Sequence, residues 1–144
     1  MAYKGKYRIK NLEKYKGDPT NVTYRSLWER KFMNYCEQNP SIIEWSSEEI
    51  AIPYKSPFDK KIHRYYPDFW IKIKKDKNIV ECILIEIKPK IQTSPPKKPA
   101  SITKKYLKEV YVYGINEAKW NAAQEFCADR RWKFEIITED HLFN

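Results

Sequence analysis

The sequence predicts an α/β fold in which helices cover both faces of a β-sheet. In the segment 79–87 one face carries Ile83, Ile85 and Ile87, and the other carries Val80, Cys82 and Leu84 before Glu86, which is typical of a central strand buried on both sides. Apolar residues also recur at helical spacing before this strand, over 24–38, and after it, over 101–113 and 116–131. Helices on either side of the strand in the chain would supply the two layers that bury it.

The first helix is predicted over residues 24–38. Ser26 and Glu29 have the spacing of a capping box, in which each side chain satisfies a backbone donor at the start of the helix. Glu29 also shares one helical face with three apolar residues, Phe32, Met33 and Cys36. Asn39-Pro40 ends the helix, because the residue before a proline disfavours the helical conformation.

Short strand patterns follow at 42–45 and 49–52, and the polar segment 55–61 reads as a turn. Residues 69–73 and 79–87 are rich in Ile, Val and aromatic residues, which predicts two strands joined by the polar turn 74–78.

The last third of the chain is predicted to hold two helices and a strand. Residues 90–100 read as a mobile, basic, proline-rich loop, followed by helices over 101–113 and 116–131, with Asn116 as the N-cap of the second. A strand over 134–137 closes the order α-β-β-β-α-α-β. The 144 residues suffice for one domain, 1–144, whose first 20 residues form a basic arm.

Composition narrows the possible partners. The chain has 28 Lys and Arg against 19 Asp and Glu, a net charge of +9, and a pI of about 9.3. This balance favours a polyanion such as DNA. No apolar run approaches the roughly 20 residues of a membrane span, so no membrane is expected. The three Gly residues are isolated, which argues against a phosphate-binding loop and a nucleotide cofactor.

The predicted hairpin brings two carboxylates together. A turn centred on Lys77 places Asp68 opposite Glu86, and directly opposed residues of an antiparallel pair have Cβ atoms roughly 5 Å apart. Lys88 shares the face of Glu86, because side chains alternate along a strand. Charges at the end of a buried strand are costly unless something pairs them, and a divalent cation would do so. This arrangement suits metal-dependent cleavage of a phosphodiester, although a plain cross-strand ion pair would give the same pattern.

Glu29 has two open interpretations. It could cap the first helix near solvent, or it could point from the helix toward Asp68 and Glu86 as a third acidic group.

These residues resemble a known superfamily. Glu29 in a first helix, then Pro67-Asp68, then Glu86-Ile87-Lys88 resembles the restriction-endonuclease-like nucleases, whose αβββαβ core and mixed sheet match the predicted order. Within that superfamily the chain is similar to TnsA-type endonucleases and, over nearly its whole length, to the head completion nucleases of large contractile-tailed bacteriophages. Four longer blocks carry this likeness: Lys14-Tyr15-Lys16-Gly17-Asp18, Tyr24-Arg25-Ser26-Leu27-Trp28-Glu29, Glu44-Trp45-Ser46-Ser47-Glu48-Glu49-Ile50 and His63-Arg64-Tyr65-Tyr66-Pro67-Asp68-Phe69. Two shorter blocks continue it, Glu117-Ala118-Lys119-Trp120 and Thr138-Glu139-Asp140.

The resemblance implies a Mg²⁺-dependent deoxyribonuclease with Glu29, Asp68, Glu86 and Lys88 as catalytic residues. Asp68 and Glu86 would bind Mg²⁺, for which Mn²⁺ could substitute, because hard carboxylate oxygens suit hard cations. The backbone carbonyl of Ile87 would be a further ligand and Glu29 an outer one. Lys88 would orient the attacking water and stabilise developing negative charge.

The expected substrate is double-stranded DNA. Candidate DNA contacts come from the arm, the segment 63–64 and the proline-rich loop: Lys4, Lys6, Arg8, Lys10, His63, Arg64, Lys90, Gln92, Lys97 and Lys98. The arm could equally be a solvated charged tail, and His63 a plain surface residue. The resemblance further implies phage portal or neck proteins as partners, and a location in the host cytoplasm during assembly or in the virion.

The sequence is also compatible with two other functions. One is a non-catalytic DNA-binding virion protein that keeps a nuclease fold, and the other is a transposition-type or structure-specific endonuclease. The intact set of four candidate catalytic residues favours an enzyme.

Overall fold

A central four-stranded sheet organises the fold in the computed structural model, which describes residues 3–143. Its strands lie in the order β3 (Ile42–Ser47), β6 (Phe69–Lys74), β7 (Val80–Ile87) and β8 (Lys133–Ile137). The first three strands pair antiparallel, and β8 pairs parallel to β7, so the sheet is mixed.

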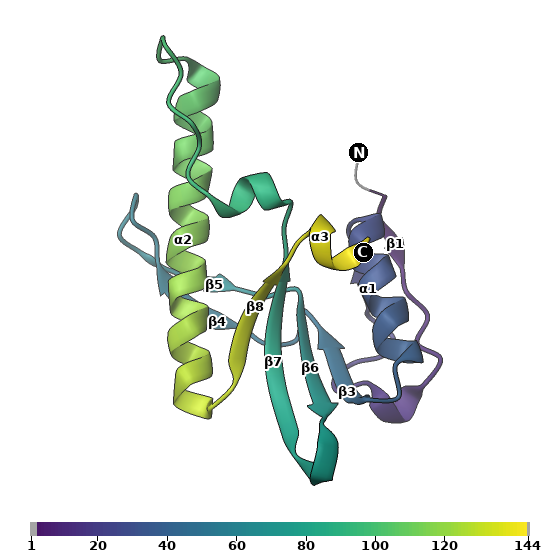
Figure 1. Cartoon of the computed structure of the whole chain (residues 1–144). Coiled ribbons are helices and arrows are strands. Elements are labelled where there is room, and N and C mark those ends of the chain that lie inside the picture. The colour runs from purple at the N-terminus through teal and green to yellow at the C-terminus, as the bar shows by residue number, and fades with distance from the viewer. Residues whose placement is uncertain (1–2, 144) are drawn as a thin grey trace.

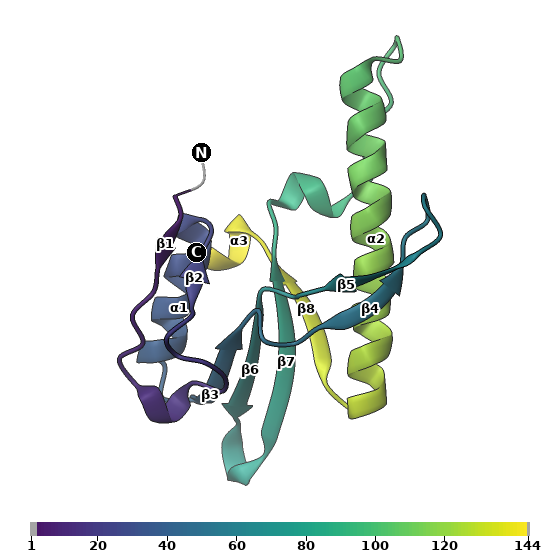
Figure 2. The same ribbon diagram turned by 180° about the vertical axis from the view of Figure 1, so that it is seen from behind.

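Helices cover the two faces of this sheet. Helix α1 (Leu27–Gln38) lies on one face and α2 (Lys104–Arg130) on the other (Figures 1 and 2). The element order α1-β3-β6-β7-α2-β8 is the predicted αβββαβ core. No helix within residues 3–143 is both long enough and apolar enough to cross a membrane.

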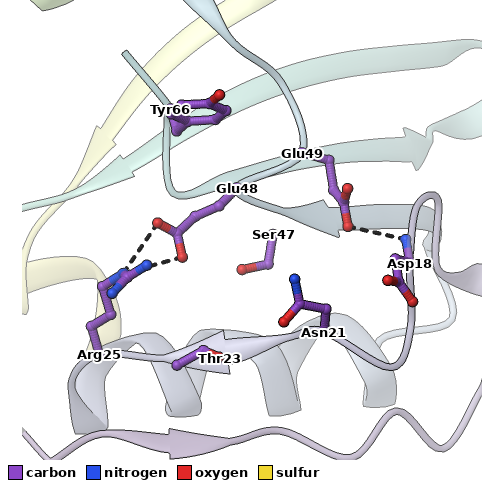
Figure 3. A pocket seen from close by; sticks show the side chains of 8 residues that line it. All are labelled: Asp18, Asn21, Thr23, Arg25, Ser47, Glu48, Glu49 and Tyr66. Atoms are coloured by element: carbon purple, nitrogen blue, oxygen red, sulfur yellow. Dashed lines mark hydrogen bonds and ion pairs between the residues drawn. The ribbon is translucent and has the colours of Figure 1, made fainter. Parts of the chain in front are cut away.

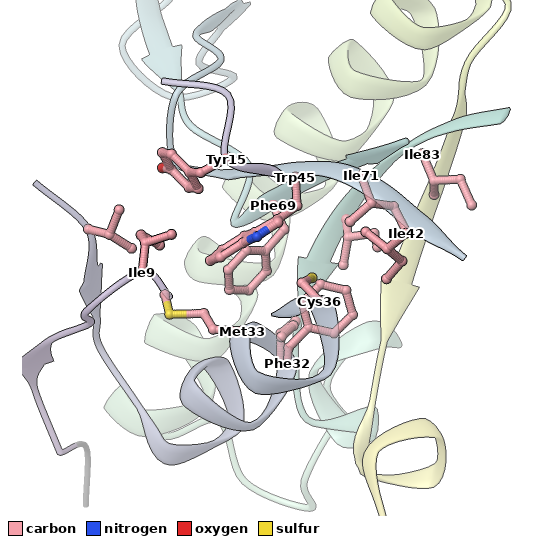
Figure 4. Close-up of a cluster of buried hydrophobic side chains, with 13 residues drawn as sticks. Ile9, Tyr15, Phe32, Met33, Cys36, Ile42, Trp45, Phe69, Ile71 and Ile83 are labelled. Carbon is pink, nitrogen blue, oxygen red and sulfur yellow. The ribbon is translucent and has the colours of Figure 1, made fainter. Parts of the chain in front are cut away.

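Strand β7 is buried on both sides, as its sequence predicts. Ile83, Ile85 and Ile87 belong to the cluster that packs with α1, whereas Leu84 packs with Trp120 and other residues of α2. Figure 4 shows the α1-side cluster, in which apolar side chains of the helix meet those of the sheet. This alternation fixes which face each residue of the strand occupies.

The central hairpin has the predicted register. Phe69 pairs with Ile85 and Ile71 with Ile83, which continues to Asp68 opposite Glu86. A short 3-10 turn, η2 (Asp76–Asn78), reverses the chain, and Lys77 and Asn78 adopt left-handed backbone conformations with φ of 60° and 64°. A shift by one residue would turn the Ile residues away from the α1 cluster, so burial reinforces the register.

The two helices predicted over 101–113 and 116–131 are one helix, α2. Its N-cap is Thr103, whose hydroxyl accepts the Tyr106 N–H at 3.1 Å, and Asn116 is buried in its interior. Gly114 costs about 1 kcal/mol relative to alanine in a helix interior, which tertiary packing outweighs. The Phe58 ring packs closely against Gly114, where an added Cβ would lie only 3.3 Å from it.

A second hairpin is inserted between β3 and β6. Strand β4 (Ile52–Lys55) begins where the predicted strand 49–52 was expected to end, and β5 (Ile62–Tyr65) was not predicted. The exposed residues 57–61 form the turn between them. Tyr54 and Tyr65 pack from this hairpin into the α2-side cluster, so burial against α2 explains two strands that carry little local signal.

The N-terminal arm is part of the domain rather than a solvated tail. Strand β1 (Gly5–Lys6) pairs with β2 (Thr23–Tyr24), and the turn η1 (Leu12–Lys14) follows. Tyr15 is buried with its ring 4.9 Å from that of Trp45, an edge-on contact worth about 0.5–1.5 kcal/mol beyond its buried area. Lys14 also caps α1, because its Nζ donates to the carbonyls of Cys36 and Asn39 at 2.8 and 3.0 Å.

Beyond β7, the predicted proline-rich loop begins with a 3-10 turn, η3 (Lys90–Thr93). The chain then runs to the far end of α2, and the last element is the short helix α3 (Glu139–Leu142) beside the N-terminal end of α1 (Figure 1).

Candidate active site

The two predicted carboxylates meet at one end of the central hairpin. Asp68 directly precedes β6, and Glu86 is the penultimate residue of β7. The Asp68 Oδ2 atom accepts the Ile87 N–H at 2.7 Å, which fixes the carboxylate against the partner strand. The Glu86 side chain lies on the same face, and this residue is only 7% exposed. The sequence therefore places both residues correctly through strand register alone.

Each Glu86 oxygen has a different partner. The Tyr65 hydroxyl donates to Oε1 at 2.7 Å, whereas the Lys88 Nζ lies 3.8 Å from Oε2. A separation of 3.8 Å is an ion pair but is too long for a hydrogen bond. The Lys88 side chain is also 27% exposed, so its ammonium stays near the two carboxylates and can still contact another anion.

The surroundings of the pair disfavour the ionised form of both carboxylates. Burial raises the pKa of Asp68, and the neighbouring charge of Glu86 raises it further. Burial also raises the pKa of Glu86, although the Tyr65 hydrogen bond and the charges of Lys88 and Lys119 act against that rise. Two carboxylates this close disfavour each other's ionised form unless a cation joins them.

Glu29 both caps helix α1 and adds negative charge near the carboxylate pair. The Glu29 N–H donates to the Ser26 hydroxyl at 3.2 Å, and its own Oε1 accepts the Arg25 N–H at 3.2 Å, one residue before the position of a standard capping box. Its charge nevertheless contributes to the raised pKa of Asp68, and burial raises its own pKa. The cap thus holds a carboxylate at the N-terminal end of α1, near the pair.

Tyr65 and Lys119 are site residues that the sequence interpretation did not single out. The Lys119 Nζ lies 5.6 Å from the centre of the Tyr65 ring and 5.9 Å from that of Tyr54. Tyr65 comes from a strand that was not predicted, and Lys119 comes from the middle of α2. Neither has a local sequence signal that ties it to Glu86, because the packing of α2 on the inserted hairpin brings them there.

The predicted DNA contacts fall into separate regions. The arm residues Lys4, Lys6, Arg8 and Lys10 are all exposed, and three of them line a surface hollow of about 270 Å³ with Tyr7, Tyr24, Arg30 and Asn34. Gln92, Lys97 and Lys98 are exposed in the proline-rich loop, and Arg64 is exposed on β5.

Two of the predicted contacts also have acidic partners. The His63 Nε2 atom lies 2.7 Å from Asp59 Oδ2, within the turn of the inserted hairpin. Lys90 pairs with Asp140 at 3.1 Å, and its backbone N–H donates to Glu139.

A polar pocket of about 310 Å³ is lined by residues of the N-terminal segment, by the end of β3 and by Tyr66 (Figure 3). Asp18, Glu48 and Glu49 line it with Arg25, whose Nε lies 3.2 Å from Glu48. The Glu48 N–H donates to the Asp68 carbonyl at 3.1 Å, which connects the pocket wall to the site. With three carboxylates and one guanidinium in its lining, the pocket is poorly suited to phosphate.

The donor set fits a hard divalent cation. Within residues 3–143 no group of three or more His, Cys, Asp or Glu side chains is close enough to enclose a metal. Mg²⁺ does not require such a cage, since it retains several waters and takes one or two protein carboxylates. Asp68 and Glu86 provide that number, and their raised pKa values show that the charged forms of both side chains are costly where they lie.

A mixed αβββαβ sheet with two carboxylates and a lysine at the ends of its central strands defines the restriction-endonuclease-like class of proteins. Comparison with known proteins agrees: the profile described as TnsA-like endonuclease N terminal matches residues 39–139. The chain belongs to this TnsA-like endonuclease family. It is also 44% identical over 146 residues to the "Head completion nuclease" of Enterobacteria phage T4, covering 99% of this chain and 95% of that protein. No solved structure matches the chain. The resemblance drawn from the sequence is thereby confirmed.

Proposed function

We propose that this protein is a divalent-cation-dependent deoxyribonuclease that acts on packaged DNA during phage head completion and head–tail joining. The observation that carries the proposal is the pair of the half-buried Asp68 and the buried Glu86, with Lys88 beside it. The relationship to a phage T4 head completion nuclease supports both the activity and its setting. That setting implies portal or neck proteins as partners, and a location in the host cytoplasm during assembly or in the virion.

Asp68 and Glu86 would hold the cation, with Mg²⁺ as the expected ion and Mn²⁺ as a substitute. When bound, the cation would neutralise the carboxylate pair and act as a Lewis acid toward the scissile phosphate. Ile87 donates to Asp68 Oδ2 and Tyr65 donates to Glu86 Oε1. Asp68 Oδ1 and Glu86 Oε2 are therefore the oxygens that would face the cation. The carbonyl of Ile87 is a further candidate ligand, and Glu29 an outer one.

Lys88 would act on the phosphate rather than on the carboxylates. Its ammonium lies 3.8 Å from Glu86 Oε2, so it can turn toward an incoming anion while Glu86 keeps it in place. A preorganised cation beside the phosphate stabilises negative charge as it develops in the transition state. The same ammonium could orient the water that attacks the phosphorus atom.

The test is cleavage of supercoiled and linear double-stranded DNA with Mg²⁺ and with EDTA. Glu86→Gln should abolish cleavage, because it removes the charge that holds the cation. Glu81→Gln is the matched control, since Glu81 lies on the same strand but at its other end, paired with Lys75 and Lys133 at 3.1 Å each. Cleavage by wild type and by Glu81→Gln, but not by Glu86→Gln, would support the assignment.

Cleavage that persists in Glu86→Gln would refute this site. DNA binding without cleavage by the wild-type protein would instead favour a structural virion protein that retains a nuclease fold. A product cut at defined positions would favour a transposition-type or structure-specific endonuclease.

A further inference from the structure

The N-terminal part of α2 projects beyond the end of the sheet (Figures 1 and 2). Within Lys104–Val112 only Tyr106 is partly buried, whereas the other residues are exposed. Nine helical residues span about 13 Å. The proline-rich loop runs up beside this segment, so helix and loop together form a projection over 94–112 that contributes little to either hydrophobic cluster.

The projection carries a concentrated positive charge. Between Pro89 and Lys108 the chain contains no acidic residue, and the first is Glu109. Five exposed lysines fall in the last part of that stretch: Lys97, Lys98, Lys104, Lys105 and Lys108. Within residues 3–143 none of the ion pairs involves any of these five.

The chain on either side of the projection leads to the candidate active site. The chain leaves the site at Lys88, enters the loop, and returns along α2 to Lys119, whose Nζ lies over the Tyr65 ring. Lys108 and Lys119 are eleven residues apart, close to three full helical turns, so they lie on one side of α2 about 16 Å apart along its axis. Lys104 and Lys105 continue the same side outward.

We propose that the projection 94–112 binds the phosphate backbone of duplex DNA flanking the bond that is cleaved. DNA presents one negative charge per roughly 1.7 Å of its axis, so a row of lysines leading away from the site would meet several phosphates. Such contacts carry no sequence information and would position any duplex. This inference rests on the proposed nuclease function and adds the surface that holds the substrate.

Charge also argues against a second copy of the chain as the occupant. Exposed apolar residues such as Leu107 and Tyr111 would suit a protein partner. A symmetric dimer through this surface would, however, bring five lysines of one copy against the same five of the other. Like charges in such an interface are unfavourable, whereas phosphates are complementary.

The test is the affinity for a labelled duplex oligonucleotide, measured by fluorescence anisotropy in EDTA so that no cleavage occurs. The variant is Lys104→Gln/Lys105→Gln/Lys108→Gln. The matched control is Lys74→Gln/Lys75→Gln/Lys77→Gln, which removes the same charge from an exposed turn at the opposite end of the sheet (Figure 1). Circular dichroism and thermal melting would establish that both variants fold as the wild type does.

The first variant should bind roughly 10- to 500-fold more weakly at 0.1 M salt, the upper value corresponding to three lost phosphate contacts. Its slope of log affinity against log salt should also fall by up to about 2.7. The control should change both quantities much less. Equal losses in the two variants would overturn the inference, because net charge alone would then explain binding.

Retained affinity in the first variant would also overturn the inference, even if that variant failed to complete phage heads, since the projection would then dock a protein. The proposed function is tested separately by Mg²⁺-dependent cleavage in the wild type. If the wild-type protein cuts DNA and the variant binds normally, only this inference fails. If the wild-type protein neither cuts nor binds DNA, the proposed function fails with it.

Discussion

Replacing Tyr65 by Phe removes the one hydrogen bond that the Tyr65 hydroxyl donates to Glu86. Tyr65 is 4% exposed, and its hydroxyl donates to Glu86 at 2.7 Å. Phe keeps the ring in the cluster with α2 and deletes this one hydrogen bond. A hydrogen bond to a charged group contributes about 1.5–3 kcal/mol, so the free energy of unfolding at neutral pH should fall by about that amount.

The same change should lower catalysis. If the bond is fully used in the transition state, 1.5–3 kcal/mol corresponds to a roughly 10- to 150-fold lower kcat. Because the bond from Tyr65 opposes the burial-driven rise in the pKa of Glu86, its loss raises that pKa further. The acidic limb of the pH–rate profile should therefore move to higher pH in Tyr65→Phe.

Tyr15→Phe is the matched control. Tyr15 is 6% exposed, donates to Glu49 at 2.8 Å and accepts the Ser47 N–H at 3.1 Å, on the other side of the sheet. Its loss should cost a similar 1–3 kcal/mol by denaturant unfolding. Its cleavage rate and pH profile should stay at the wild-type values under conditions where the variant is folded. Wild-type kinetics in Tyr65→Phe, or an equal loss in both variants, would refute the role assigned to Tyr65.

Two further predictions concern the carboxylate pair. Asp68→Asn should abolish cleavage yet raise the melting temperature in EDTA at neutral pH, because burial and Glu86 raise the pKa of Asp68 and its charged form is costly. The native state of the wild type holds this proton above pH 3.8 while the unfolded chain releases it. The stability advantage of Asp68→Asn should therefore grow as the pH rises from 3.8 through the raised pKa of Asp68. An advantage that stays constant or shrinks would show that the fold does not destabilise the charged form of Asp68. Mg²⁺ at about 100 times its Kd should stabilise the wild type by about 2.7 kcal/mol, and Asp68→Asn much less. Equal stabilisation of both in thermal melts would place the cation elsewhere.

The projection and the carboxylate pair divide the proposed activity between two parts of the fold. The pair lies at one end of the β6–β7 hairpin, where hydrogen bonds from Ile87 and Tyr65 hold the two carboxylates, which favours a fixed geometry for chemistry. The lysines lie on an exposed helix and loop, where long side chains can adapt to the irregular positions of phosphates. Lys119 connects them, because it shares a helical side with Lys108 and reaches Glu86 through its charge.

Local pattern was enough to predict the centre of this protein. The apolar alternation of β7 and the polar turn at 74–78 specify strand pairing, and pairing alone brings Asp68 beside Glu86. Helix α1 was equally predictable, since Ser26 caps it and Phe32, Met33 and Cys36 mark its buried face. In each case the interacting residues are either close in the chain or related by a simple period, so the physics that places them can be read locally.

Contacts between distant segments were not predictable in this way. The sequence suggested that one helix ends and another begins before Asn116. The structure has a single helix there, with Phe58 packed against Gly114 and Asn116 buried. The arm carries a charge pattern that suits a tail, yet Tyr15 is buried against Trp45. Tyr65 and Lys119 reach Glu86 from a hairpin and a helix whose relative placement depends on the whole α2-side cluster. Hydrophobic burial acts between any surfaces that fit, regardless of separation along the chain, and it leaves no periodic signal at the polar residues that it carries into place.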